Sequence, residues 1–234
     1  HEDRDQCSPL MLAAAYGHAH ILRALIDAKA SIDSVGKDNR SALLRAVHNG
    51  HAEATQVLLD SNANVELKNH YEKTPLLVAV SHGHNTIVRI LIDARANVEA
   101  TTSAKRTALM LAADRGDAAS VQALINANSQ LESRDIYGCT ALLLACSNGH
   151  VDVIRTLLSA NAMLEGHGSS YYTPLMTAAD SGRAAVVETL IRGKAKANVV
   201  DCDGMSPLML AASNGHTSTV HTLLEIALAE AGTL

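Results

Sequence analysis

The chain has 234 residues, of which 47% are hydrophobic and 18% charged, so it can bury a large core and is neither disordered nor a charged tail. Its net charge of -5 and its lack of a long basic run argue against a nucleic-acid partner. No apolar run approaches the roughly 18 residues of a membrane-spanning helix, so we expect no membrane insertion.

The cysteines and the first residues of the chain indicate the cellular compartment of the protein. The four cysteines are dispersed and form no Cys-x-x-Cys pair (Cys7, Cys139, Cys146 and Cys202). This density is below that of a disulfide scaffold and fits a reducing compartment, and the first residues do not form a signal peptide. We therefore expect an intracellular, cytoplasmic location. The chain starts at His1 rather than Met, which suggests a fragment or a processed form.

One motif recurs along the whole chain every 33 residues without an insertion. It reads SPLMLAA at Ser8, SALLRAV at Ser41, TPLLVAV at Thr74, TALMLAA at Thr107, TALLLAC at Thr140, TPLMTAA at Thr173 and SPLMLAA at Ser206. A fixed period of this kind is the signature of a repeat protein. Seven repeats fill the chain, at about residues 3–35, 36–68, 69–101, 102–134, 135–167, 168–200 and 201–233.

Each repeat predicts two helices. The Ser or Thr that opens the motif is a good N-cap, and all four prolines directly follow it, where a missing N–H costs nothing. Five residues after the cap stands an Ala that lets helices approach, and nine residues after it a Gly that ends the first helix. A second, amphipathic helix follows, with Leu at 25, 58, 91, 124, 157, 190 and 223.

A polar link, such as ANVELKNHYEK from Ala63, connects each second helix to the next repeat. The link is too long for a tight turn and too polar to be buried, so we expect the links to project as fingers. A carboxylate recurs within them (Asp33, Glu66, Glu99, Glu132 and Glu165). This periodicity favours a solvated or backbone-bonding role over a carboxylate row that binds cations.

A 33-residue helix-turn-helix unit with Thr-Pro-Leu-x-x-Ala-Ala and Gly-His resembles the ankyrin repeat, over essentially the whole chain. The resemblance implies an all-α fold, an α-solenoid of stacked helix-turn-helix repeats with finger-like hairpin loops. It also implies one domain of residues 1–234, with a concave groove lined by the first helices. The chain departs from the family at two positions. The His after Thr-Pro-Leu is Met or Leu throughout, so apolar packing must stabilise that position. The Gly after the second helix is replaced, which predicts a different helix end in some repeats (Lys29, Asn62, Arg95, Asn128, Asn161 and Lys194).

The stretch SHGHNTIVRILIDA places His82 and His84 either side of a glycine and raises the question of a metal site. His84 fills the position after the repeat's Gly, which four other repeats also fill with His, so it is a periodic structural residue. The spacing of the two histidines does not place them on one helical face. No acid or Cys completes a tetrahedral set nearby, so we expect no metal.

Catalysis is not indicated by any motif in the chain. It contains no Gly-x-Ser-x-Gly, no Gly-rich phosphate loop and no His-Glu-x-x-His, and its glycines belong to the repeat. We expect no catalytic residues, no enzyme activity and no cofactor.

The tyrosines are the only aromatic residues other than His, because the chain has no Phe or Trp, and none occupies a core position of the repeat. Tyr71, Tyr137, Tyr171 and Tyr172 lie on finger tips, and Tyr16 lies near the end of a first helix. Tyr is enriched at binding hot spots, although fingers could also simply tolerate it. The resemblance implies partner contacts at Tyr16, Arg40, His70, Tyr71, Lys73, Arg106, Tyr137, Tyr172, Met205, His82, Arg115 and Asn148.

The sequence therefore predicts a non-catalytic scaffold that binds a partner protein through the concave groove and the finger loops. The fingers of repeats two to four are cationic and those of repeats five and six aromatic, so a partner with an acidic segment followed by an apolar one would fit. The alternative is a structural subunit that permanently braces other chains in a large assembly. The apolar last helix, TVHTLLEIALAEAGTL, suggests further repeats or a covering subunit at that end.

Overall fold

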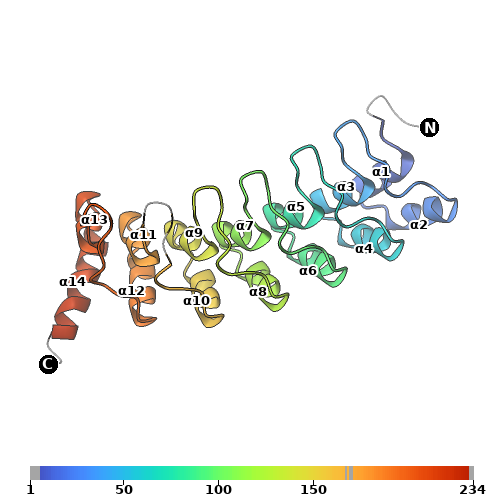
Figure 1. The fold of residues 1–234 in the computed structure, drawn as a ribbon. Helices are drawn as coiled ribbons and strands as arrows, with labels where there is room; N and C mark the ends of the chain where they lie inside the picture. Colours follow the sequence, from blue (N-terminus) through green and yellow to red (C-terminus); the bar gives the residue numbers. More distant parts are fainter. Residues whose placement is uncertain (1–5, 167, 169–170, 232–234) are drawn as a thin grey trace. The chain divides into compact units, whose positions relative to one another are not determined.

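A computed structural model describes residues 6–166, 168 and 171–231 of the chain (Figure 1). In this part every regular element longer than an isolated β-bridge is an α-helix, which confirms the all-α prediction. The first helices of the seven repeats are α1 (Pro9–Ala15), α3 (Ala42–His48), α5 (Pro75–His82), α7 (Ala108–Arg115), α9 (Ala141–Asn148), α11 (Pro174–Asp180) and α13 (Pro207–Ser213). The second helices are α2 (Ala19–Asp27), α4 (Ala52–Asp60), α6 (Asn85–Asp93), α8 (Ala118–Asn126), α10 (Val151–Ser159), α12 (Ala184–Arg192) and α14 (Thr217–Ala231).

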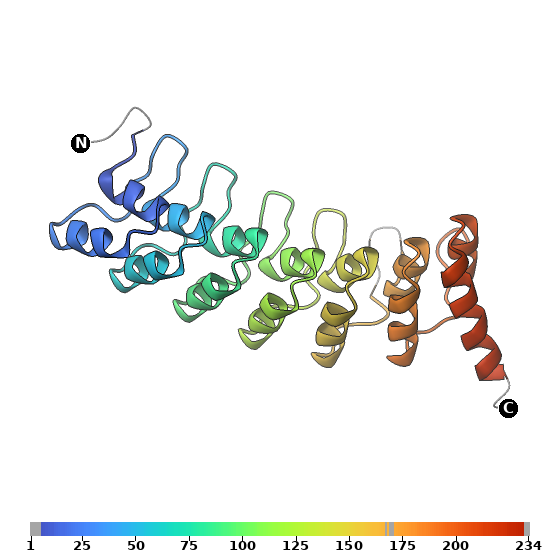
Figure 2. The same ribbon diagram turned by 180° about the vertical axis from the view of Figure 1, so that it is seen from behind.

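The helices fall into two compact units. One contains the chain up to Ala112 together with Asn126–Ser129, and the other contains Ala113–Ile125 and the chain from Gln130 onward. In the first unit α1, α3 and α5 pack side by side in one row and α2, α4 and α6 in a second row. In the second unit α9, α11 and α13 form one row and α10, α12 and α14 the other, as Figure 2 shows from behind. That residues 1–234 act as one domain stays a prediction.

The first helices begin and end as the sequence predicts. The Oγ of Ser8 accepts a hydrogen bond from the backbone N–H of Met11 at 3.3 Å, and the equivalent bond recurs in every repeat. Each such cap stabilises a helix by about 1 kcal/mol. At the other end the glycine is left-handed, with φ of 75° at Gly83 and 85° at Gly149. The predicted N-caps and the glycines that end the first helices are thus confirmed.

The second helices end alike in the first six repeats, so the prediction of different ends at the substituted positions is wrong. The residue in place of glycine has φ between 61° and 71° in all six (Lys29, Asn62, Arg95, Asn128, Asn161 and Lys194). At Lys29 the N–H donates to the carbonyl of Ile26 at 2.9 Å, and the next N–H, of Ala30, donates to Leu25 at 3.0 Å. These paired bonds form a Schellman motif, which offsets the strain of a left-handed backbone at a residue other than glycine.

Apolar packing replaces the family's His in six of the seven repeats. The side chains there are at most 3% exposed (Met11, Leu44, Leu77, Met110, Leu143 and Met176). Met209, the same position in repeat seven, is 53% exposed. The Leu of each second helix is buried from Leu58 to Leu223, whereas Leu25 is half-buried. The core therefore lies between the two helix rows of each unit.

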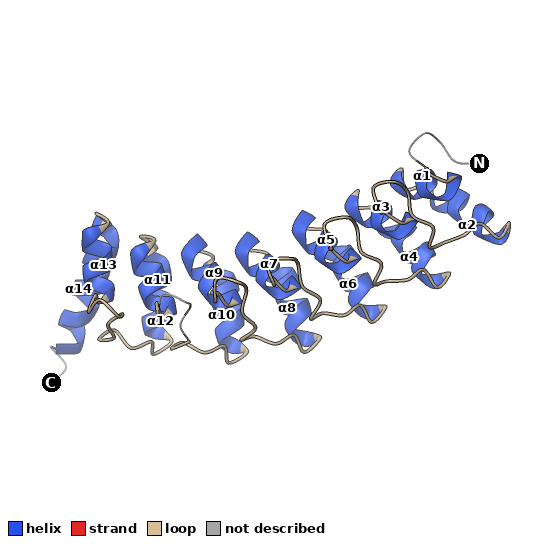
Figure 3. Cartoon of the chain, turned by 45° about the horizontal axis from the view of Figure 1, so that its top comes forward, coloured by secondary structure: helices blue, strands red, loops and turns tan. Residues whose placement is uncertain are grey.

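The links form narrow, hairpin-like turns, drawn as tan loops in Figure 3. In the third repeat the N–H of Asn69 donates to the carbonyl of Lys73 at 3.1 Å, and the N–H of Glu72 donates back to Asn69 at 3.0 Å. The backbone of Glu72, just before Lys73 in this turn, is left-handed, with φ of 58°. None of the described helices combines the length and apolarity needed to cross a bilayer.

Candidate functional site

In four repeats the histidine after the glycine bonds to the repeat before it. The Nε2 of His150 lies 3.0 Å from the carbonyl oxygen of Asp114, at the end of the preceding first helix. A Cβ on Gly116 would lie 2.6 Å from the ring, so the glycine there is needed for space as well as for its φ of 77°. The same bond to a preceding carbonyl is made by His51, His84 and His216. These contacts confirm that the periodic histidines are structural.

Two repeats fill this position with other residues. Arg183 makes an equivalent bond, since its Nε donates to the carbonyl of Ser147 at 2.9 Å. The carboxylate of Asp117 instead accepts from the N–H of Ser120 at 3.1 Å and caps its own helix, α8. The position thus uses an N–H donor in five described repeats and an acceptor in one.

His82 and His84, in the stretch SHGHNTIVRILIDA, lie closer together than their sequence spacing suggests. The rings of His82 and His84 have centroids 5.8 Å apart, because the left-handed turn at Gly83 folds the chain back. The ring of His48, in α3, contacts the ring of His82 edge-on, with centroids 4.5 Å apart. Burial, and then the charge of Arg40, lower the pKa of His48. No set of three or more His, Cys, Asp or Glu in the described chain could hold a metal, and the expected lack of a metal remains a prediction.

The recurring carboxylates of the links bond to the backbone of the next repeat. Glu66 Oε1 accepts from the N–H of Asn97 at 2.7 Å, and Asp33, Glu132 and Glu165 accept in the same way from the N–H groups of Asn64, Met163 and Lys196. This confirms the backbone-bonding interpretation. These four bonds each join a link to the link of the following repeat.

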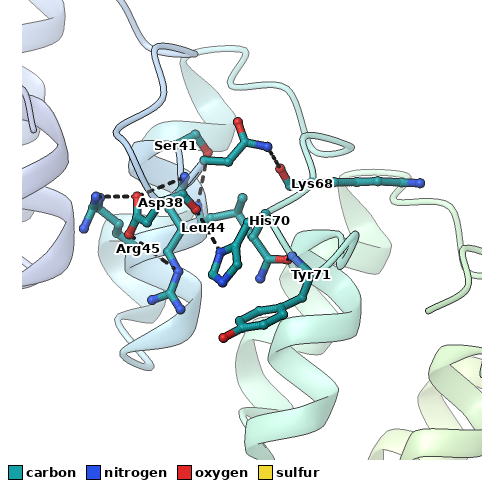
Figure 4. Close-up of polar contacts among 10 residues, drawn as sticks. Asp38, Ser41, Leu44, Arg45, Lys68, His70 and Tyr71 are labelled. Carbon is teal, nitrogen blue, oxygen red and sulfur yellow. Dashed lines mark hydrogen bonds and ion pairs between the residues drawn. The ribbon is translucent and has the colours of Figure 1, made fainter. Parts of the chain in front are cut away.

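Each finger is numbered here by the repeat that it opens, so that finger two contains Asp38 and finger three contains His70. Fingers two and three of the first unit are tied together by polar bonds (Figure 4). The Nδ1 of His70 lies 3.1 Å from the carbonyl oxygen of Asp38, and the Nδ2 of Asn39 donates to the carbonyl of Lys68 at 3.1 Å. The ring of Tyr71 packs on His70 with centroids 3.7 Å apart. His70 and Tyr71 are thus held in place although both are exposed.

An ion pair that sequence reasoning missed supports finger two. Arg45, within α3, donates to the Oδ1 of Asp38 at 2.8 Å, and Arg40 Nε lies 3.7 Å from its other carboxylate oxygen. Arg45 side-chain exposure is only 16%, so this pair is more strongly shielded from water than a surface salt bridge. The signal was available in the sequence, because Arg45 is the one charged residue at its position among the seven repeats.

Some of the sequence-predicted residues of the first unit are connected by short contacts. Lys73 donates from Nζ to the Oγ of Ser81 at 3.3 Å, next to the exposed His82. The charge of Arg40 reaches His48, which touches His82. Arg106 lies at the base of finger four, where its N–H donates to Thr102 Oγ1 at 3.2 Å. Tyr16 lies apart from these residues on the first repeat and is 70% exposed.

In the second unit, Tyr137 and Tyr172 come together around a hollow of about 350 Å³. Its other walls are Cys139, Leu143, Leu144, Ser147, Gly168 and Thr177. Tyr137 is 61% exposed, whereas Tyr172 is half-buried and thus less open to solvent than the other finger-tip tyrosines. Burial, followed by the charges of Asp180, Asp201 and Asp203, raises the pKa of Tyr172.

The remaining predicted residues of the second unit lie outside this hollow. Asn148 donates from Nδ2 to the carboxylate of Asp114 at 3.0 Å, so its amide links two repeats. Arg115 is exposed at the end of α7, and Met205 is half-buried at the base of finger seven.

Buried polar residues at the start of the fingers were missed by the sequence reasoning. Asp135 Oδ1 accepts from the N–H groups of Tyr137 and Cys139, both at 2.9 Å, and Asn69 does the same for Tyr71 and Lys73. Asn and Asp favour such turns. The sequence signal that could have identified these turn-forming residues is an Asn or Asp two residues before a tyrosine.

Comparison with known proteins gives one family. A family model described as ankyrin repeats (3 copies) matches residues 10–102, 76–165 and 160–231. The crystal structure of the human ASB11 ankyrin repeat domain is 28% identical, with a TM-score of 0.81 over 93% of this chain and 97% of that one. The ankyrin repeat domain of Bcl-3, a unique member of the IkappaB protein family, is 23% identical, with a TM-score of 0.84 over 94% of this chain and 99% of that one. At this identity the likeness supports the fold alone. No curated protein sequence matches the chain.

Proposed function

Because the chain belongs to the ankyrin-repeat family and has its α-solenoid fold, we propose that it is a non-catalytic scaffold that binds a partner protein through the first helices and the fingers. Ankyrin-repeat domains are generally protein–protein interaction modules. The chain carries no catalytic motif, and its net charge of -5 disfavours nucleic acid. Dispersed cysteines fit a cytoplasmic location, which forms part of the proposal.

The observation that carries this proposal is the exposure of the tyrosines. Tyr16, Tyr71, Tyr137 and Tyr171 are 60% to 70% exposed, in a chain with no Phe or Trp. Packing of the core does not require them there. Tyrosine combines a large contact area with few rotatable bonds and a polar tip, which suits a binding anchor. Bonding of Asn69 and Asp135 to the finger backbone holds two of them ready for contact.

The proposed contact surface includes all the residues that the family resemblance implies. In the first unit it is cationic at Arg40, Lys73 and Arg106, with His70, His82, Tyr16 and Tyr71 beside them. In the second unit it comprises Arg115, Tyr137, Asn148, Tyr172 and Met205. An acidic segment of the partner would complement the first group, and an apolar segment the second.

A second candidate function is permanent structural bracing of other chains. It is favoured by apolar side chains exposed on repeat seven, where Met209 is 53%, Leu224 43% and Leu228 72% exposed. A covering subunit or further repeats would bury them. A bracing subunit would lose its partners when Met209 is changed to Lys, whereas a groove binder would keep them.

The deciding experiment is quantitative co-purification from cells that make the protein, with mass spectrometry. We expect Tyr16, Tyr71 and Tyr137, changed together to Ala, to shift the free energy of unfolding by no more than about 0.5 kcal/mol per exposed site. One buried anchor is worth about 2 kcal/mol, so partner capture should fall at least about thirtyfold.

The matched control is a triple Ala variant of exposed residues on the second helices, at Gln56, Arg89 and Arg155. It should capture the partner normally. If the control loses the partner and the tyrosine variant keeps it, the second helices form the binding face and the proposal is wrong.

A further inference from the structure

The hollow of the second unit has an apolar floor and open aromatic walls. Leu143 and Leu144 of α9 are only 3% and 8% exposed and form part of its lining. Tyr137 from finger five and Tyr172 from finger six stand at its sides. Its volume of about 350 Å³ lies at the small end of the roughly 300–1,000 Å³ range of ligand pockets. That size suits a protruding side chain better than a cofactor.

Three carboxyl groups act on Tyr172, which lines the hollow, and one of them, Asp180, follows the lining residue Thr177 by about one turn of α11. Asp180 ends α11, and Asp201 and Asp203 belong to finger seven, and all three raise the pKa of the Tyr172 phenol after its burial. Asp201 is buried and accepts from the N–H groups of Asp203 and Met205, so it is already engaged. Asp203 is exposed and Asp180 half-buried, so both can receive a cation.

Two arginines bond to the backbone beside the hollow. Arg134 donates from Nη1 to the carbonyl of Gly138, between the lining residues Tyr137 and Cys139, at 3.2 Å. Arg183 donates from Nε to the carbonyl of Ser147, which lines the hollow, at 2.9 Å. The carboxylate of Asp180 accepts from the Nδ2 of Asn214 at 2.9 Å, and a carboxylate has several further acceptor positions. The carboxyl groups that act on Tyr172 make the hollow acidic at that residue, in contrast to the cationic fingers of the first unit.

We propose that this hollow receives one large apolar side chain of an extended partner segment, and that a Lys or Arg beside it in that segment pairs with Asp203 and Asp180. The inference rests on the proposed function and gives the chemistry of the partner at this surface. The apolar side chain is desolvated against Leu143 and Leu144, and the two tyrosines cover it from the sides. The cation sets the direction of the segment, because the carboxylates act on the hollow from the side of Tyr172.

The test uses random peptides displayed on phage and selected on the whole chain. We expect the enriched peptides to share a large apolar residue with Lys or Arg within one or two positions. Synthetic copies labelled with a fluorophore then report affinity by polarisation. Enrichment of peptides without this pattern, or of none, overturns the inference.

Two variants locate the bound peptide. Ser147→Phe fills the hollow and should weaken peptide binding at least tenfold, whereas Ser213→Phe, at the same position of repeat seven and exposed, should not. Asp203→Asn should weaken binding severalfold and reduce its salt dependence, while Glu225→Gln, an equal charge change on α14, should leave it unchanged. Circular dichroism checks each fold, and Tyr137→Ala, which removes an exposed wall, tests the hollow independently if Ser147→Phe unfolds.

Failure of peptide binding at the hollow and failure of partner binding give different results. Unchanged peptide affinity in Ser147→Phe and Tyr137→Ala means that the hollow is not the site, although the groove can still bind a partner. Normal partner capture by the triple tyrosine variant contradicts the proposed function itself.

Discussion

Replacing His150 by Ala should weaken the junction between repeats four and five. The ring donates from Nε2 to the carbonyl oxygen of Asp114 at 3.0 Å, and it packs where a side chain on Gly116 would collide. Alanine removes both contacts and leaves the last carbonyls of α7 with one donor fewer.

The size of the loss follows from these two contacts. A partly buried hydrogen bond contributes about 1 kcal/mol net, and the ring packing adds up to about another 1 kcal/mol. We expect the free energy of unfolding to fall by about 1–2 kcal/mol. Because repeats interact mainly with their neighbours, the loss should concentrate in α9 and α10, where amide exchange should quicken about five- to thirtyfold.

Urea unfolding and hydrogen exchange measure these two quantities. His150→Arg is the matched control, because Arg183 fills the same position in repeat six and bonds to the equivalent carbonyl at 2.9 Å. It should keep most of the stability. The reasoning is refuted if His150→Ala unfolds like the parent, or if His150→Arg loses as much as His150→Ala.

Arg95→Gly should raise the unfolding free energy by about 0.5–1 kcal/mol in urea, since φ is 61° there and Gly is unstrained; a loss of stability contradicts this. Met176→Gln should cost about 2–4 kcal/mol because that side chain is fully buried, whereas Met209→Gln at the 53% exposed position should cost less than about 0.5 kcal/mol; equal shifts in melting temperature contradict this. His48 should titrate below its usual 6.5 by NMR, because burial and Arg40 lower its pKa. The unfolded chain then binds the proton more readily, so the contribution of His48 to stability is present above pH 6.5 and is lost as pH falls through its folded pKa. A midpoint at or above 6.5 contradicts this.

The helices were predictable because their determinants are local. An N-cap such as Ser8 acts on an N–H three residues away, and Gly83 ends α5 through its own φ. The periodic position of His84 identified it as structural, although its acceptor, the carbonyl of His48, lies 36 residues away. The 33-residue period thus predicted the structural role of a residue whose bonding partner lies in another repeat.

Features that depend on particular neighbours were not predictable. The substituted ends of the second helices kept the glycine conformation, because backbone bonds such as Ala30 to Leu25 do not involve the side chain. The half-burial of Tyr172 and the hollow beside Tyr137 depend on how two fingers meet. The charge of Arg45 stood out in the sequence, but its partner, Asp38, follows only from the contact between a helix and its own finger.

The bonds between successive repeats also bear on how the chain is made. Side-chain bonds such as Asn39 to Lys68 and His51 to Ala15 join residues only 29 and 36 positions apart. Proteins rich in such short-range contacts fold quickly, and synthesis proceeds at about 5–20 residues per second. Each repeat can therefore dock on its predecessor within seconds of leaving the ribosome. The apolar faces are then covered in the order in which they are translated, which shortens the time for which each could aggregate.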